Sequence, residues 1–175
     1  MKKSAKQTKP QTPRLYIAYG SNLNQFQMNY RCPTAKVVDT AVVTDYQLMF
    51  RGQDGFAVAT IEPSDGAEVP VMVWNLQEAD EKALDLYEGY PSFYRKEMMT
   101  VNVNGEPTEA MVYVMNDGEP FGNPSRKYLN TIIRGYEMAG FNKDTLFDAL
   151  CYSFDRHKLE SLQHLDDSDF GMKMW

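Results

Sequence analysis

Short apolar segments separated by turn-forming residues fill residues 15–114, and this pattern constrains the fold more than any other feature of the chain. Valine pairs and aromatic residues, which strands favour, are frequent in these segments. The sequence Asn-Gly-Glu-Pro at 104–107 predicts a hairpin, and Glu-Pro-Ser-Asp-Gly at 62–66 predicts a turn. Strands are therefore expected at 15–18, 36–43, 45–51, 56–61, 69–74, 94–103 and 109–114.

Helical patterns interrupt the strands once and then follow the last of them. Apolar spacing predicts a helix over 77–87, and two more are expected at 125–139 and 144–152. Ser125 is a suitable N-cap, and Gly140 suits the position after a helix end. Because strands and helices do not alternate regularly, a doubly wound sheet is excluded and the class is α+β. We expect a small mixed sheet with flanking helices, partly closed into a barrel because closure removes exposed edges.

The two ends of the chain differ in composition from the part between them. Residues 1–13 are rich in lysine and show no hydrophobic periodicity, which is typical of a flexible basic tail. They also lack the apolar core of a signal peptide. Residues 157–175 contain Asp-Asp-Ser-Asp and are expected to form an acidic tail. The predicted domain therefore spans 14–156.

Composition narrows the range of partners. The net charge of −6 and the isoelectric point near 4.9 argue against nucleic acid or an anionic membrane as the main partner. No segment approaches the ~20 apolar residues of a membrane span. Cys32 and Cys151 are far apart in the sequence, which favours reduced thiols and a cytoplasmic location. The oligomeric state stays open.

Histidine is too scarce for a metal site or a Ser–His–Asp triad. His157 and His164 both lie near the C-terminus. No metal is therefore expected, and any acid–base chemistry falls to a carboxylate.

The segment 19–23, with the sequence Tyr-Gly-Ser-Asn-Leu, directly follows the first expected strand. A strand that leads into a glycine turn and a helix start presents free backbone N–H groups in one direction. This predicts a small cradle for an anion or an oxyanion. The glycine spacing fits neither a dinucleotide-binding motif nor a P-loop. Ser21 lacks the sequence of a nucleophile elbow, so a hydrogen-bonding role is expected instead.

A helix that ends at Glu88 is the second candidate feature. Gly89 suits the left-handed position after a helix, and Pro91 cannot continue one. A carboxylate at the negative end of a helix dipole, between Tyr87 and Tyr90, is disfavoured in its ionised form. Glu88 is therefore a candidate for a raised pKa and for a general base. The alternative is a surface glutamate that happens to precede a glycine.

Three segments together resemble the γ-glutamylcyclotransferase family: Tyr-Gly-Ser-Asn-Leu at 19–23, Tyr-Glu-Gly-Tyr-Pro at 87–91 and Pro-Ser-x-x-Tyr at 124–128. They occur in the family's order, and the resemblance covers residues 15–150. It implies a mixed barrel with flanking helices and release of 5-oxoproline from a small γ-glutamyl substrate, without metal or cofactor. It also implies that Glu88 is the acid–base residue. The residues that it implies for substrate binding are Tyr19, Gly20, Ser21, Asn22, Leu23 and Tyr128.

The implied reaction needs no nucleophilic side chain. The α-amine of the substrate attacks its own γ-carbonyl, closes a five-membered ring and expels an amino acid, peptide or amine, while Glu88 accepts and returns a proton. The loop at 19–23 holds either the α-carboxylate or the oxyanion, and the leaving group stays undetermined. Glu62 and Glu97 are fallback bases, and Arg95 is a candidate partner for a substrate carboxylate.

Two alternatives to this function stay open. One is a cyclotransferase that acts on γ-glutamylamines, including side-chain isopeptide products. The other is a binding or regulatory module that keeps the fold without turnover.

Overall fold

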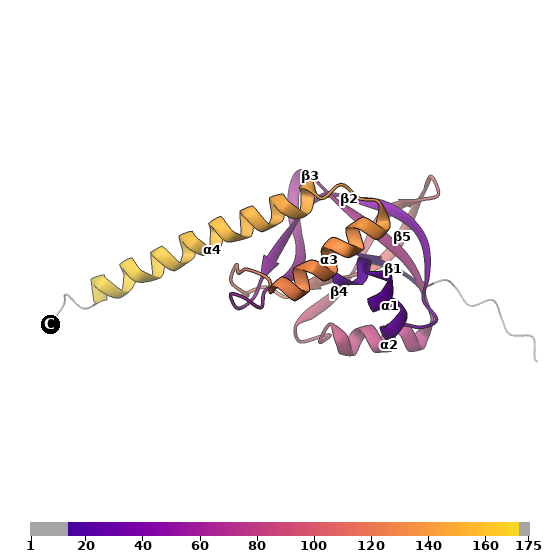
Figure 1. Ribbon diagram of the computed structural model, residues 1–175, viewed down its shortest axis with the longest axis horizontal. Helices are drawn as coiled ribbons and strands as arrows, with labels where there is room; N and C mark the ends of the chain where they lie inside the picture. The colour runs from indigo at the N-terminus through magenta and orange to yellow at the C-terminus, as the bar shows by residue number, and fades with distance from the viewer. Residues whose placement is uncertain (1–13, 172–175) are drawn as a thin grey trace, which may run out of the picture.

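The strands form one five-stranded sheet in the order β2-β3-β1-β5-β4 (Figure 1). The structure is a computed structural model that describes residues 14–171, with side chains described as far as residue 163. Neighbouring strands are antiparallel, except that β1 and β5 are parallel. The strands are β1 (Arg14–Ala18), β2 (Lys36–Arg51), β3 (Val58–Leu76), β4 (Tyr94–Val103) and β5 (Glu106–Met115).

Helices flank this sheet, and the ends of α3 agree with the sequence prediction. Ser125 caps α3 by accepting a hydrogen bond from the Tyr128 N–H at 3.2 Å. Gly140 ends α3 in the left-handed conformation, with φ 71°. The helical elements of the described residues are η1 (Ser21–Leu23), α1 (Gln25–Arg31), α2 (Glu78–Tyr87), α3 (Arg126–Ala139) and α4 (Asp144–Gly171).

Strands β2 and β3 are longer than the sequence pattern predicts. The two strands expected at 36–43 and 45–51 are one strand, with a register shift between Thr44 and Tyr46. The turn expected at 62–66 is an irregularity inside β3, where the Gly66 N–H donates to Asp45 Oδ1 at 2.8 Å. Bulges of this kind bend a strand pair without ending it. The Gly- and Asp-rich segments therefore curve the sheet here instead of terminating it.

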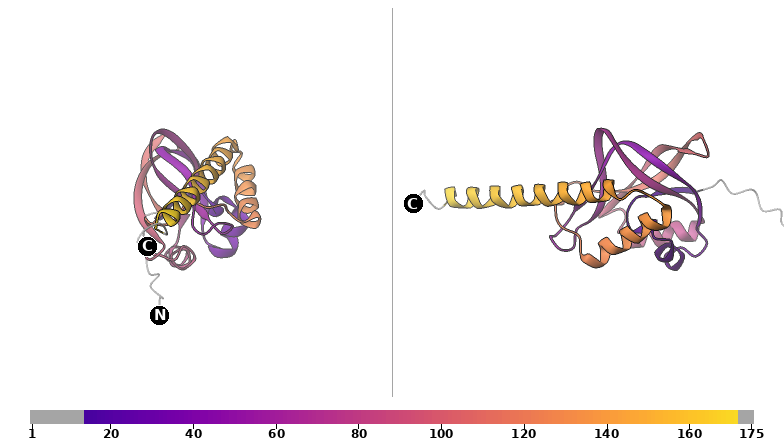
Figure 2. Two further views of the ribbon diagram at one scale, coloured as in Figure 1. Left: turned by 90° about the vertical axis from the view of Figure 1, so that its left-hand side faces the viewer. Right: turned by 45° about the horizontal axis from the view of Figure 1, so that its top comes forward.

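The sheet curls but does not close into a barrel (Figures 1 and 2). Within residues 14–171, no hydrogen-bonded ladder joins the edge strands β2 and β4. The α+β class with flanking helices is confirmed, and the expected partly closed barrel is corrected to an open, curved sheet. The two edges approach each other without pairing, and the Asn104 N–H that follows β4 donates to the side-chain Oδ2 of Asp39 in β2 at 2.7 Å. Helix α4 packs on β2 instead, where Ser153 Oγ accepts a hydrogen bond from the Phe50 N–H at 2.8 Å.

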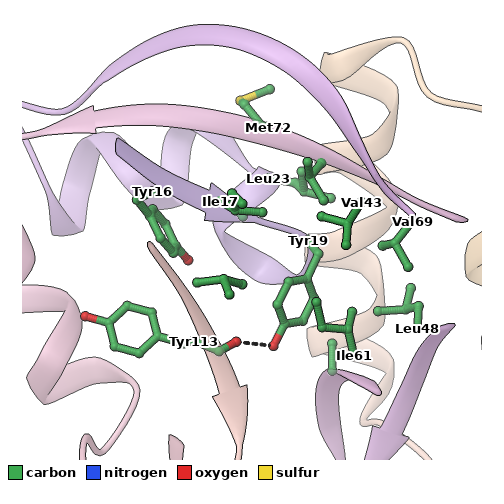
Figure 3. Close-up of a cluster of buried hydrophobic side chains, with 14 of the residues drawn as sticks. Tyr16, Ile17, Tyr19, Leu23, Val43, Leu48, Ile61, Val69, Met72 and Tyr113 are labelled. Carbon is green, nitrogen blue, oxygen red and sulfur yellow. Dashed lines mark hydrogen bonds between the residues drawn. The ribbon is translucent and has the colours of Figure 1, made fainter. Parts of the chain in front are cut away.

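The core fixes the position of the loop that follows β1. Apolar side chains of β1, η1, β2 and β3 meet in one cluster (Figure 3). Ile17 before the loop, Leu23 at its end and Ile61 of β3 are fully buried. Because both ends of the loop are anchored by buried side chains, the backbone between them is held in one place.

Helix α4 continues well beyond the predicted end at residue 152, to Gly171, and it projects away from the sheet (Figure 2). No glycine or proline interrupts residues 144–170, so nothing local stops the helix. It crosses the domain end expected at residue 156 and extends into the segment expected to be an acidic tail. The basic tail expected at 1–13 lies outside the described residues. None of the helices described here is long and apolar enough to cross a membrane.

Candidate active site

The loop after β1 forms one wall of a pocket. The Leu23 N–H donates to Gly20 O at 3.0 Å, so it is used within the turn. Among residues 14–171, no acceptor takes the N–H groups of Gly20, Ser21 or Asn22, and these three residues line the pocket. Three residues of the predicted cradle therefore border the pocket, and their role in holding an anion stays a prediction. Leu23 contributes a buried side chain to the core rather than a pocket surface.

The carboxylate of Glu88 lies opposite this loop. The Glu88 N–H donates to Leu84 O at 2.8 Å, and Gly89 follows with φ 65°, so α2 ends where the sequence predicts. Glu88 Oε1 accepts a hydrogen bond from Asn22 Nδ2 at 2.9 Å. Burial raises the pKa of Glu88 to about 7, although the Arg31 charge and the Asn22 hydrogen bond oppose this shift. Near neutral pH the carboxyl group can therefore both accept and return a proton.

Tyrosines form the remaining polar wall. Tyr19 OH donates to Tyr113 O and Tyr94 OH to Ala59 O, each at 2.6 Å. Tyr128 OH accepts from the Ala59 N–H at 3.1 Å. Burial raises the pKa of each of these three hydroxyl groups above its usual value, so the phenols stay neutral at pH 7. The pocket is lined by Tyr16, Tyr19, Gly20, Ser21, Asn22, Ala59, Glu88, Tyr94, Tyr113 and Tyr128.

Gly20 allows the close approach of this wall to β3. A Cβ atom at Gly20 would lie 3.3 Å from Ala59 Cβ and 3.5 Å from Tyr128 OH. A side chain at position 20 would therefore crowd Ala59.

Several residues singled out in the sequence lie elsewhere. Arg95 contacts Glu97 at 2.7 Å and Met115 O at 2.5 Å, and neither charged side chain lines the pocket. Glu62 pairs with Arg51. Tyr90 is 41% exposed and lies outside the pocket lining. Within residues 14–163, no group of three or more His, Cys, Asp and Glu side chains could hold a metal ion.

Two residues near Glu88 carry no signal in the sequence. Ala59 lines the pocket from β3, in a segment that reads only as a buried strand. Arg31, at the end of α1, donates from Nη1 to Asn22 Oδ1. Nothing in its local sequence distinguishes it from a surface arginine at a helix end.

The raised pKa of Glu88 makes the protein less stable as the pH rises. The unfolded chain ionises this carboxyl near its usual value of 4.5 and the folded protein near 7. Stability is therefore lost between these two values, and above them the burial of the charge costs about 3 kcal/mol. We expect Glu88→Gln to lack this loss, so that it is more stable than the native chain at pH 8 and closer to it at pH 5. Urea unfolding at both pH values measures this, and an equal difference at the two would contradict it.

Comparison with known proteins identifies the family. A family model described as gamma-glutamyl cyclotransferase, AIG2-like, matches residues 16–132. The gamma-glutamylcyclotransferases of Homo sapiens and Bos taurus are 30% and 32% identical over 135 residues, which is 72% of this chain and 71% of each relative. A solved gamma-glutamyl cyclotransferase superposes with a TM-score of 0.65 and 28% identity, over 74% of this chain and 81% of that one. The chain therefore belongs to the gamma-glutamyl cyclotransferase, AIG2-like family of enzymes.

Proposed function

We propose that the protein releases 5-oxoproline from a γ-glutamyl amino acid, peptide or amine, with Glu88 as the acid–base residue. The observation that carries this proposal is the position of the Glu88 carboxyl, with a pKa of about 7, in one pocket with the N–H groups of Gly20, Ser21 and Asn22. This cyclisation requires a proton acceptor and a set of hydrogen-bond donors that stabilise negative charge.

The reaction begins with the substrate α-ammonium group. Its pKa is roughly 8, and Glu88 accepts one proton from it. The freed amine attacks the γ-carbonyl carbon, which forms the new C–N bond and places negative charge on the carbonyl oxygen. The old C–N bond then breaks as the leaving nitrogen takes the proton back from Glu88. The ring nitrogen gives its second proton to the freed Glu88 carboxylate, which passes it on to the released amine. Both nucleophile and electrophile belong to the substrate, so the protein has only to hold the chain curled.

The uncharged tyrosine hydroxyl groups of the pocket suit this proton transfer. The hydroxyl groups of Tyr19, Tyr94 and Tyr128 are held by backbone atoms and remain protonated. Among the residues that line the pocket, Glu88 alone has a carboxyl group. Because the tyrosine hydroxyls are protonated, no other side chain of the lining competes for the substrate proton at pH 7. We assign the three loop N–H groups to the negative charge of the glutamyl part, either its α-carboxylate or the oxyanion.

A panel of substrates tests the proposal. We expect 5-oxoproline from γ-glutamyl-alanine, and the panel adds a γ-glutamyl tripeptide and ε-(γ-glutamyl)-lysine. Release from the isopeptide alone would assign the protein to the γ-glutamylamine class. If no member of the panel yields 5-oxoproline, the proposed activity is wrong and a binding module on this fold becomes the better explanation. The product is quantified by chromatography and mass spectrometry.

A further inference from the structure

We propose that Arg31 is a positioning residue for the reaction proposed above: its guanidinium fixes the Asn22 amide so that the amide NH2 faces the Glu88 carboxyl group. The inference rests on the proposed function for its kinetic consequences only. Its structural basis is a chain of contacts from α1 through the loop to the end of α2.

The Asn22 amide has three partners that permit one orientation. Asn22 Nδ2 donates to Tyr16 OH at 2.8 Å and to Glu88 Oε1 at 2.9 Å. Arg31 Nη1 donates to Asn22 Oδ1. An arginine can only donate and an ionised carboxylate can only accept, so a rotated amide would oppose both neighbours. Arg31 therefore determines which side of Asn22 faces the pocket.

Arg31 is itself held by two elements. Its Cζ lies 3.3 Å from the centroid of the Tyr87 ring, and its Nη2 donates to Gln27 Oε1 at 3.3 Å. Tyr87 directly precedes Glu88, and its hydroxyl lies 3.1 Å from Ser21 Oγ. A planar guanidinium can stack on the ring and donate from its edge at the same time, which an ammonium group cannot do. The guanidinium of Arg31 therefore contacts the loop through Asn22, α1 through Gln27 and the end of α2 through Tyr87.

Arg31 also carries the positive charge that affects the ionisation of Glu88. Its charge lowers the pKa of Glu88 against the larger effect of burial. The other titratable groups that interact electrostatically with Glu88 have pKa values raised by burial and are neutral at pH 7. They come from β1 and the loop after it, from the residue after α1, and from β4, β5 and α3. They are Tyr16, Tyr19, Cys32, Tyr94, Tyr113 and Tyr128.

More distant charges around the site have partners of their own. Asp85, which accepts a hydrogen bond from Tyr113 OH, pairs with Lys96 at 2.7 Å. Arg95 pairs with Glu97 at 2.7 Å. Asp80, beside Cys32, accepts hydrogen bonds from Thr34 and from the Gln77 N–H. These groups therefore do not replace the charge of Arg31.

The test compares Arg31→Met, Arg31→Lys and the exposed control Arg134→Gln by the pH dependence of kcat/KM. Activity falls at low pH as Glu88 becomes protonated. Loss of the opposite charge of Arg31 should move this acid limb of Arg31→Met up by about one pH unit. Arg31→Lys should keep the native limb with a lower maximum, because the charge stays while the planar fork is lost. Arg134→Gln should match the native profile. Equal acid limbs in all four proteins would overturn the proposal.

A second measurement does not depend on turnover. Titration of the Glu88 carboxyl carbon by 13C NMR should give a higher pKa in Arg31→Met than in the native chain and in Arg31→Lys. If no substrate is turned over, the proposed function fails, and this titration still decides whether Arg31 sets the ionisation of Glu88. The same pKa in native and Arg31→Met proteins would overturn the inference even in an active enzyme.

Discussion

Glu88→Gln should lower kcat/KM for 5-oxoproline release by about 1,000-fold, within the range of losses seen when a general acid–base group is removed. Glutamine nearly matches glutamate in size, and its carbonyl oxygen can still accept the hydrogen bond from Asn22 Nδ2. The amide cannot take a proton from the substrate α-ammonium group, and it cannot return one to the leaving nitrogen. The substitution should therefore lower the rate of the reaction and leave the fold unchanged. Initial rates on the best substrate of the panel, with circular dichroism as a check on folding, measure it.

Glu97→Gln is the matched control for this variant. Glu97 pairs with Arg95 at 2.7 Å and lies outside the pocket lining, although the sequence makes it a fallback base. Its rate should stay close to that of the native chain. An active Glu88→Gln would remove Glu88 from the mechanism, and an inactive Glu97→Gln with an active Glu88→Gln would assign the base to Glu97.

Gly135→Ala should destabilise the protein by about 2 kcal/mol, because a side chain is forced into a packed contact. A Cβ atom at this position of α3 would lie 2.6 Å from Leu23 Cβ and 2.9 Å from the backbone nitrogen of Asn24. Backbone atoms cannot move aside as a flexible side chain can. We expect η1 to shift away from α3 and to carry the N–H groups of Ser21 and Asn22 with it. Urea unfolding gives the stability, and kcat/KM of the folded variant should also fall.

Helix propensity makes the sign of this result informative. Inside a helix, alanine is favoured over glycine by about 1 kcal/mol, so propensity alone predicts that Gly135→Ala is more stable than the native chain. Asn130→Ala, at an exposed position of the same helix, is the control and should be as stable as the native chain or slightly more so. A Gly135→Ala variant that is stabilised would show that the contact between α3 and η1 is not tight.

Local sequence signals predict the ends of the helices near the site correctly. Ser125 and Gly140 bound α3, and Glu88 and Gly89 end α2, as expected. These predictions succeed because caps and left-handed glycines depend on neighbours within one turn of the chain. The turn predicted at 62–66 fails because the pairing of β2 with β3 resumes on both sides of it, with Tyr46 opposite Pro63 and Thr44 opposite Glu68. Such pairing joins residues far apart in the sequence, as does the hydrogen bond from the Gly66 N–H to Asp45 Oδ1.

The environment of Glu88 likewise depends on residues that are distant in the sequence. The sequence points to Tyr87 and Tyr90 as its aromatic neighbours, but these side chains are 46% and 41% exposed. The tyrosines that line the pocket with Glu88 come from β1, β4, β5 and α3. Burial raises the pKa of the carboxyl, and these distant elements supply most of the pocket in which it is buried.

The sequence by itself determined the α+β class, the turn after β1, the end of α2 at Glu88 and the order of the segments that resemble the family. Each of these depends on residues close together in the chain. Only the tertiary structure decided that the sheet stays open, that Leu23 belongs to the core and that Arg31 reaches Asn22. It also brought Glu88 into one pocket with the loop of β1. Such contacts join residues far apart in sequence, and their geometry follows from how strands curve and helices pack, which local patterns do not encode.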